Sequence, residues 1–222
     1  MREWFVAHYD VWKDFAGPAV TLIGFAITTT LAIIGLNTFG RWKKEKIEEK
    51  RIDVAIEALA CAYEAKFVFE AIRSRLVRDY EYQDMSLNGD SVIVLDERRR
   101  NQGGTYAVLK RLEHHEEFFE RVRKLEPKFM AVFGGDTEEI FSLLFGAKST
   151  VVSTAEALID EYRVELDATD TEGRERRKQW RSVVFASPGK IEPDDDVGTK
   201  VLEFRSLIEK RCRPIVDREF RS

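Results

Sequence analysis

A stretch of 26 residues without an ionisable side chain, at positions 15–40, constrains the fold more than any other feature of this sequence. As an α-helix it would be about 39 Å long, against roughly 30 Å for the hydrocarbon core of a bilayer. Its leucine, isoleucine, valine and phenylalanine side chains each favour insertion by roughly 0.3–0.6 kcal/mol. We therefore predict one transmembrane helix at 15–40, preceded by a short extracytoplasmic segment, residues 1–14.

A cleaved signal peptide and the core helix of a soluble protein are the alternatives to a transmembrane helix. A signal peptide has a basic start, a shorter apolar region and a cleavage site between small residues. Here 14 residues of mixed character come first, and Asn-Thr-Phe-Gly ends the apolar segment before a basic stretch. Aromatic residues near both ends, including Trp12 and Trp42, are typical of membrane interfaces. These features favour the transmembrane helix.

The distribution of basic residues predicts the orientation of this helix. Two precede it, and several follow it closely, including Arg41, Lys43, Lys44 and Lys46. Because basic flanks stay in the cytoplasm, we expect a single-pass protein of the bacterial inner membrane with residues 52–222 in the cytoplasm. Residues 41–51 are predicted to be a basic juxtamembrane stalk. The four named residues would contact anionic headgroups of the lipid bilayer, at about 1 kcal/mol each.

Small residues recur on one face of the apolar segment. Such a face lets two helix backbones approach closely, which predicts self-association into a homo-oligomer through the membrane. The alternative is that the stripe reflects only the abundance of Gly, Ala and Thr in this segment. The stripe consists of Gly17, Thr21, Gly24, Thr28, Ala32 and Gly35.

Residues 52–222 show helical periodicity and no clear strand alternation. One helix is expected to run from the membrane to about Tyr80, with two apolar stripes that predict packing on two sides, one through Ile56 and Phe67 and one through Val54 and Ile72. The fold class is therefore predicted to be all-α, with the transmembrane helix followed by an antiparallel bundle of four to five helices. Further helices are expected at about 105–125, 136–162 and 174–185 and around 201–213.

Capping and breaking residues predict the ends of these helices. Thr105 is expected to cap the second helix, and Pro127 to follow its end near Leu125. Asp136 with Glu139 is predicted to form a capping box, and Pro214 to bend or end the last helix. The helix after the capping box should bury Ile140, Leu144, Ala147, Val151, Ala155, Leu158 and Tyr162.

Residues 85–104 are predicted to form a long loop that holds one short strand at 92–95. The segment contains Asn88-Gly89, three consecutive arginines and Gly103-Gly104. Because long loops in compact domains are functional or flexible, this is where we expect contact with an unknown protein partner.

The sequence offers little catalytic chemistry. The His114-His115 pair has no metal-binding or ribonuclease spacing, so His115 is expected to be a hydrogen-bonded histidine that faces the core. Cys61 and Cys212 are expected to be buried thiols. We predict no catalytic, metal-binding or cofactor-binding residue and no cofactor. The balance of 36 basic against 40 acidic residues also argues against a nucleic-acid partner.

A basic cluster around a tryptophan has three possible roles. It could contact a membrane surface, bind phosphate or nucleic acid, or simply be the solvated face of a short helix. The cluster consists of Arg174, Arg176, Arg177, Lys178, Trp180 and Arg181.

These observations lead to three functional hypotheses. The preferred one is a membrane-anchored, non-enzymatic helical interaction or scaffold module at the cytoplasmic face, which self-associates. The second is a membrane-permeabilising effector of the bacterial defence or toxin type, whose span oligomerises when the cytoplasmic part senses a trigger. The third is an enzyme with a site near His115.

Overall fold

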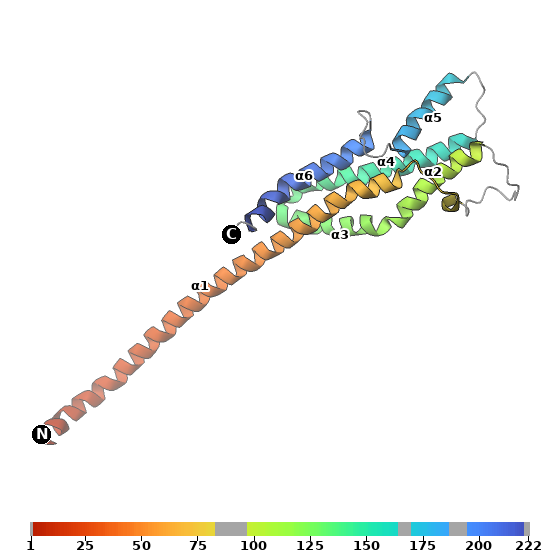
Figure 1. Ribbon diagram of the computed structural model, residues 1–222. Helices are drawn as coiled ribbons and strands as arrows, with labels where there is room; N and C mark the ends of the chain where they lie inside the picture. The colour runs from red at the N-terminus through yellow and green to blue at the C-terminus, as the bar shows by residue number, and fades with distance from the viewer. Residues whose placement is uncertain (1, 83–96, 164–169, 187–194, 220–222) are drawn as a thin grey trace. The chain divides into compact units, whose positions relative to one another are not determined.

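The computed structural model describes residues 2–82, 97–163, 170–186 and 195–219, and every regular element in these ranges is a helix (Figure 1). The predicted all-α fold class is confirmed. The predicted strand at 92–95 lies outside the described residues. The elements are α1 (Arg2–Ile72), the short 3₁₀ helix η1 (Asp79–Tyr82), α2 (Glu97–His114), α3 (Glu116–Phe133), the 3₁₀ helix η2 (Gly135–Thr137), α4 (Glu138–Arg163), α5 (Thr171–Val184) and α6 (Asp196–Glu219).

The chain divides into two compact units, Met1–Arg51 and Ile52–Ser222. The first unit lies within α1, and its residues from 17 to 50 are exposed along their whole length. Its large apolar side chains from Val20 to Phe39 are each 54–72% exposed. In the described part of the chain, this is the one helix long and apolar enough to cross a bilayer.

The second unit is a helical bundle in which α4 packs against α2, α5 and α6. The apolar stripe predicted for α4 is confirmed, because all seven of its residues from Ile140 to Tyr162 are buried. Phe141 on this helix lies in edge-to-face contact with Phe129 of α3 and Phe204 of α6, at ring-centroid distances of 5.4 and 5.9 Å. These aromatic contacts connect three helices at the centre of the core.

The part of α1 that belongs to the bundle is buried on one side, and the prediction of packing on two sides was wrong. Its buried face is rich in alanine, with Ala55, Ala58, Ala62 and Ala65 at most 1% exposed. On the other face Ile56 is 46% exposed and Phe67 is 67% exposed. The core therefore forms on the alanine-rich face of α1, and the face that carries Ile56 and Phe67 is left largely exposed. The free thiols of Cys61 and Cys212 are buried, as predicted.

Two predicted boundaries near the second helix were wrong. α1 ends at Ile72 and not near Tyr80. α2 already begins at Glu97, so the predicted loop 85–104 is helical from 97 onward, and its residues 85–96 lie outside those described. Thr105 does not cap a helix: it is buried within α2, and its hydroxyl donates to the carbonyl of Asn101 at 3.0 Å. Pairing with this carbonyl explains how a threonine fits inside the helix.

The break between α2 and α3 occurs at His115, whereas Pro127 lies inside α3. The predicted break at Pro127 was therefore wrong. Pro214 likewise lies inside α6 and does not end that helix. A proline has no N–H, so the carbonyl four residues before it loses its helical hydrogen bond. Both prolines are exposed, so water can reach these carbonyls. The predicted α5 is correct in type but begins at Thr171, because Asp170 accepts the N–H of Gly173 at 2.8 Å and caps the helix there.

The connection from α3 to α4 depends on Gly134. Its φ of +105° is unfavourable for a residue with a side chain, and a Cβ atom there would lie 2.7 Å from Oδ1 of Asp136. The predicted capping box was wrong, since Asp136 belongs to η2 and its carboxylate accepts from Arg211 of α6 at 2.6 Å.

Candidate functional site: a cationic pocket beside α5

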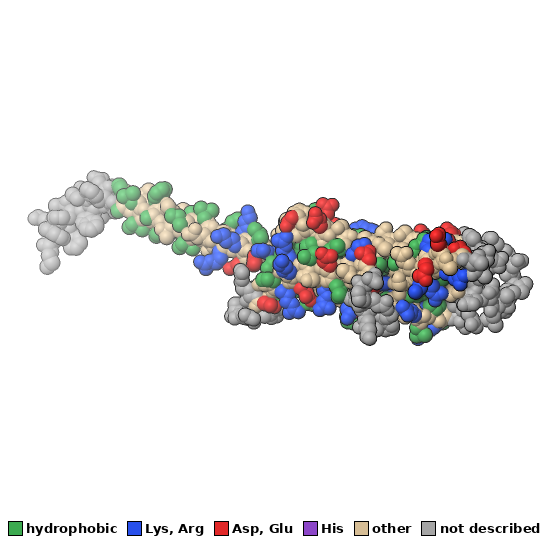
Figure 2. Space-filling view, turned by 90° about the horizontal axis from the view of Figure 1, so that it is seen from above, with side chains coloured by type: hydrophobic (Ala, Val, Ile, Leu, Met, Phe, Trp, Pro, Cys, Tyr) green, Lys and Arg blue, Asp and Glu red, His purple; other side chains and the backbone are tan. Residues whose placement is uncertain are grey.

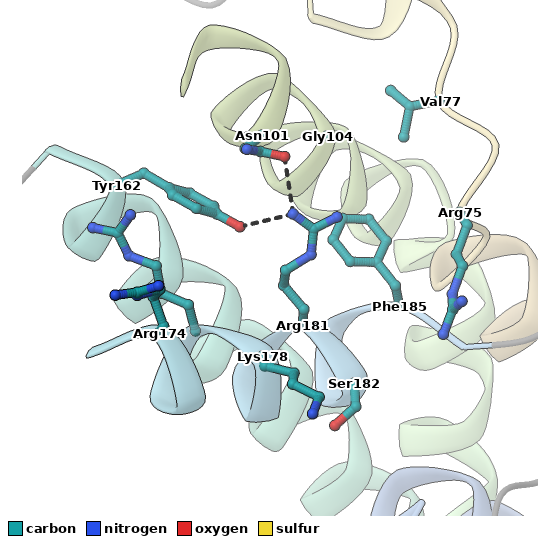
Figure 3. A pocket seen from close by; sticks show the side chains of 11 residues that line it. Arg75, Val77, Asn101, Gly104, Tyr162, Arg174, Lys178, Arg181, Ser182 and Phe185 are labelled. Carbon is teal, nitrogen blue, oxygen red and sulfur yellow. Dashed lines mark hydrogen bonds between the residues drawn. The ribbon is translucent and has the colours of Figure 1, made fainter. Parts of the chain in front are cut away.

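A pocket of about 740 Å³ opens beside α5 in the second unit (Figure 3). This volume lies within the range of roughly 300–1,000 Å³ that is usual for small-molecule sites. Its walls come from the segment after α1 and from α2, α4 and α5. The lining residues are Arg75, Val77, Asn101, Gly104, Tyr162, Arg174, Arg177, Lys178, Arg181, Ser182 and Phe185.

Positive charge dominates this lining. Four of its cations, Arg174, Arg177, Lys178 and Arg181, recur on α5 at spacings of three, one and three, which brings them to one face of the helix. Arg75 adds a fifth from the segment that follows α1. None of the described lining residues is acidic. The pocket is therefore suited to an anion.

Two guanidinium groups are held by contacts with the pocket wall. Arg181 donates from Nη1 to Oδ1 of Asn101 at 2.9 Å and to the hydroxyl of Tyr162 at 3.3 Å (Figure 3). Arg177 lies over the ring of Tyr162 at 5.2 Å and donates from Nη2 to the carbonyl of Glu161 at 2.6 Å. Asn101, Tyr162 and the Glu161 carbonyl are neutral groups, and these contacts orient the two guanidinium groups.

Carboxylates compensate part of the charge. Glu161 binds Arg176 at 2.7 Å, and its Oε1 lies 4.0 Å from Nε of Arg177. Lys178 forms a longer pair with Glu175 at 3.8 Å, in which both side chains are at least three-quarters exposed. An exposed pair of this kind is weak, so it compensates little of the charge of Lys178.

An apolar wall faces the cations on one side of the pocket. Gly104 of α2 is buried, and a Cβ atom added there would lie 3.6 Å from Cζ of Phe185 and 3.9 Å from Cγ2 of Val77. The absence of a side chain at Gly104 thus keeps the α2 surface flat beside the phenyl ring. Arg181 lies 6.0 Å from the centroid of that ring.

The structure separates the basic cluster predicted from the sequence into two groups. Arg174, Arg177, Lys178 and Arg181 line the pocket. Arg176 and Trp180 do not line it; they lie together, with the guanidinium 5.8 Å from the indole, and Trp180 packs against the core. Among the remaining lining residues, Asn101 and Gly104 belong to the segment 85–104 that was predicted to contact a protein partner, and the others were not predicted as a site. Tyr162 was assigned to the core stripe of α4, and Gly104 to a loop.

A single arginine of α2 holds the segment that carries Arg75 and Val77. Arg111 forms a two-point ion pair with Glu81, at 2.6 and 2.8 Å, and both side chains are 15% exposed. The same guanidinium donates to the carbonyls of Ser74 and Leu76 at 2.8 and 2.6 Å. These bonds fix residues 74–81 against α2 and so place one wall of the pocket.

The ion pair predicts a pH-dependent contribution to stability. Hydrogen bonding from Arg111 lowers the pKa of Glu81 below its usual 4.5, although partial burial opposes the shift. Because the folded-state pKa is the lower one, this stabilisation is complete above pH 4.5 and is lost as the pH falls through the folded-state value. We expect the urea midpoint of the wild-type chain to exceed that of Glu81→Gln at neutral pH, and the difference to shrink below pH 4.5. A difference that stays constant down to acid pH would contradict the assignment.

His115 lies at the junction of α2 and α3 and not in the core. Its ring is half-buried, and the centroid of the His114 ring is 5.6 Å away. Burial, and then the neighbouring His114, lower the pKa of His115. The described residues show no hydrogen bond from this ring, so the predicted hydrogen-bonded, core-facing histidine was wrong. Among the described residues, no group of three or more His, Cys, Asp or Glu side chains could hold a metal ion.

The other predicted site residues lie on the exposed surface of the first unit. Arg41, Lys43, Lys44 and Lys46 are exposed, and Lys46 also pairs with Glu49 at 2.5 Å. In the small-residue stripe the hydroxyls of Thr21 and Thr28 donate to the carbonyls of Gly17 and Gly24, at 3.0 and 2.7 Å. Contact of these residues with lipid or with a second helix stays a prediction.

Fold and site together define an all-α helical bundle with a cationic pocket, joined to one long apolar helix. Comparison with protein-family models, curated proteins and solved structures gives no match.

Proposed function

We propose that this chain is a membrane-anchored, non-enzymatic interaction module whose bundle lies at the cytoplasmic face of the bacterial inner membrane. The observation that carries the proposal is the apolar surface of the first unit. Figure 2 shows apolar side chains along the visible face of this part of α1, followed by a group of Lys and Arg. Phe25 and Leu36 are each 72% exposed. Burying one such side chain is worth about 1.5–3 kcal/mol, so water is a poor environment for this helix.

The composition of the bundle's core also supports the proposal. Its core contains large buried side chains on five helices, including Phe119, Phe141 and Phe204. The second unit therefore needs nothing from the apolar segment to bury a core, which leaves that segment available for lipid. The basic residues after it fit a cytoplasmic orientation of the bundle.

The glycines of the apolar segment support self-association. A Cβ atom at Gly17, Gly24 or Gly35 would meet nothing within 4 Å. These positions therefore leave bare backbone on an exposed helix, which a second copy of the same helix can approach.

Alkaline extraction of inner membranes tests the anchor. We expect the full chain to stay in the membrane pellet in sodium carbonate at high pH, and a variant that begins at Arg41 to be released. Release of the full chain would contradict the proposal. Membrane potential is recorded in the same cells, because depolarisation by the full chain alone would favour the permeabilising effector over the passive module.

A further inference from the structure

We propose that the cationic pocket binds a nucleotide, that is, a small ligand with both a phosphate chain and an aromatic base. The proposal concerns the second unit alone and does not depend on membrane anchoring. It rests on three observations: the charge of the lining, the way its guanidinium groups are held, and the apolar wall that faces them.

The positive charge of the lining indicates that the ligand carries phosphate groups. Arg174, Arg177 and Lys178 follow one another along a single face of α5, so a chain of phosphates can contact more than one of them at once. Guanidinium groups bind phosphate oxygens with two parallel hydrogen bonds, and lysine adds a point charge. Arg75 contributes a further cation from outside α5.

The fixed guanidinium groups indicate a built site rather than a merely solvated surface. Arg177 is held by the Tyr162 ring and the Glu161 carbonyl, and Arg181 by Asn101 and the Tyr162 hydroxyl. Tyr162 is only 5% exposed and therefore provides a rigid support for both. A cation that is already ordered loses less conformational entropy when it binds its ligand.

The apolar wall indicates that the ligand also carries an aromatic base. The Phe185 ring and Val77 lie beside the bare backbone of Gly104, and the amide of Asn101 lies on the same helix (Figure 3). A phenyl ring can stack on any base, and an amide can hydrogen-bond to a base edge. Inorganic phosphate or a lipid headgroup would use the cations but would have no aromatic group to place against the Phe185 ring.

Calorimetric titration of the full chain in a neutral maltoside detergent tests the proposal. ATP, GTP, CTP and UTP are titrated without magnesium, beside sodium tripolyphosphate, inorganic phosphate and a single-stranded oligonucleotide. We expect at least one nucleoside triphosphate to bind with one site per chain, more tightly than tripolyphosphate. The affinity should fall as ionic strength rises.

Two variants separate the parts of the site. The pair Arg174→Glu with Lys178→Glu should weaken nucleotide binding at least ten-fold. The matched control, Lys124→Glu with Lys210→Glu, makes the same charge change at exposed positions of α3 and α6 and should leave the affinity within two-fold. Phe185→Leu keeps an apolar side chain but removes the ring, so it should weaken the nucleotide about five-fold or more and leave tripolyphosphate unchanged.

Several results would overturn the proposal. One is the absence of binding by all four nucleotides at millimolar concentration in a chain whose circular dichroism shows an intact bundle. Equal losses of nucleotide affinity in the pocket pair and the control pair would show that binding depends on overall charge and not on the pocket. If tripolyphosphate bound as tightly as the nucleotides, the base would contribute nothing to the affinity. Binding of the oligonucleotide alone, or loss of nucleotide binding when phosphatidylglycerol is added to the micelles, would assign the cations to nucleic acid or to lipid.

Discussion

Replacing Arg73 with methionine should lower the free energy of unfolding of the bundle by about 3–5 kcal/mol. The guanidinium of Arg73 forms a two-point ion pair with Asp195, at 2.9 and 2.8 Å, and the two side chains are 3% and 10% exposed. It also donates to the carbonyls of Ser182 and Val183, at 3.1 and 2.9 Å. Methionine fills a similar volume but leaves a nearly buried carboxylate and two carbonyls without this donor.

Urea unfolding followed by circular dichroism measures this loss. The control is Arg75→Met, two residues further on at an exposed position, which should change the unfolding free energy by less than about 0.5 kcal/mol. The double variant Arg73→Met with Asp195→Asn should be more stable than Arg73→Met alone, because no buried charge is left unpaired. Asparagine keeps the oxygen that accepts the N–H of Gly198, at 3.0 Å, at the start of α6. Equal stability of Arg73→Met and wild type would show that the ion pair is not buried as described.

Replacing both Ile27 and Leu31 with arginine should abolish membrane retention. The two side chains are 56% and 63% exposed and lie near the middle of the apolar segment. An arginine at the centre of a transmembrane helix costs about 2.5–3.5 kcal/mol, and each substitution also removes a favourable residue. The total, roughly 6–8 kcal/mol, exceeds the several kcal/mol by which the native segment favours insertion.

Carbonate extraction and separation of the soluble fraction measure this effect. The matched control exchanges the two residues, Ile27→Leu with Leu31→Ile, and should remain in the membrane pellet. Neither position belongs to the small-residue stripe, so insertion is tested apart from self-association. If the double arginine variant stayed in the membrane, the apolar segment would not be the anchor.

The helical class could be predicted from the sequence because periodicity is a local property. The stripe on α4 is the clearest case, since its seven residues recur at helical spacing and all of them are buried. The same reasoning failed on α1, where both stripes are apolar. Periodicity does not contain the information that neighbouring helices pack on alanines and leave Phe67 exposed. Similarly, Pro127 and Pro214 are exposed within their helices, and such exposure depends on how the helices pack in the folded chain.

The pocket could be predicted only in part, for a related reason. The cations of α5 are adjacent in sequence, and their spacing could have separated Arg174, Arg177, Lys178 and Arg181 from Arg176. Arg75, Asn101 and Tyr162 reach the same pocket through contacts between distant parts of the chain, which no local pattern encodes. Arg111 is a further example, because nothing in its sequence neighbourhood indicates its partner, Glu81.

The way Arg111 holds residues 74–81 affects how a ligand could enter the pocket. This segment is held by the guanidinium of Arg111 and by a backbone bridge between Ser74 and Ala186, and its large side chains Leu76 and Tyr80 are exposed. Opening it therefore requires less free energy than unfolding the core. Arg75 and Val77 would move away together in such an opening while the other helices stayed packed. Entry and exit of a bound molecule would then follow the frequency of this local opening.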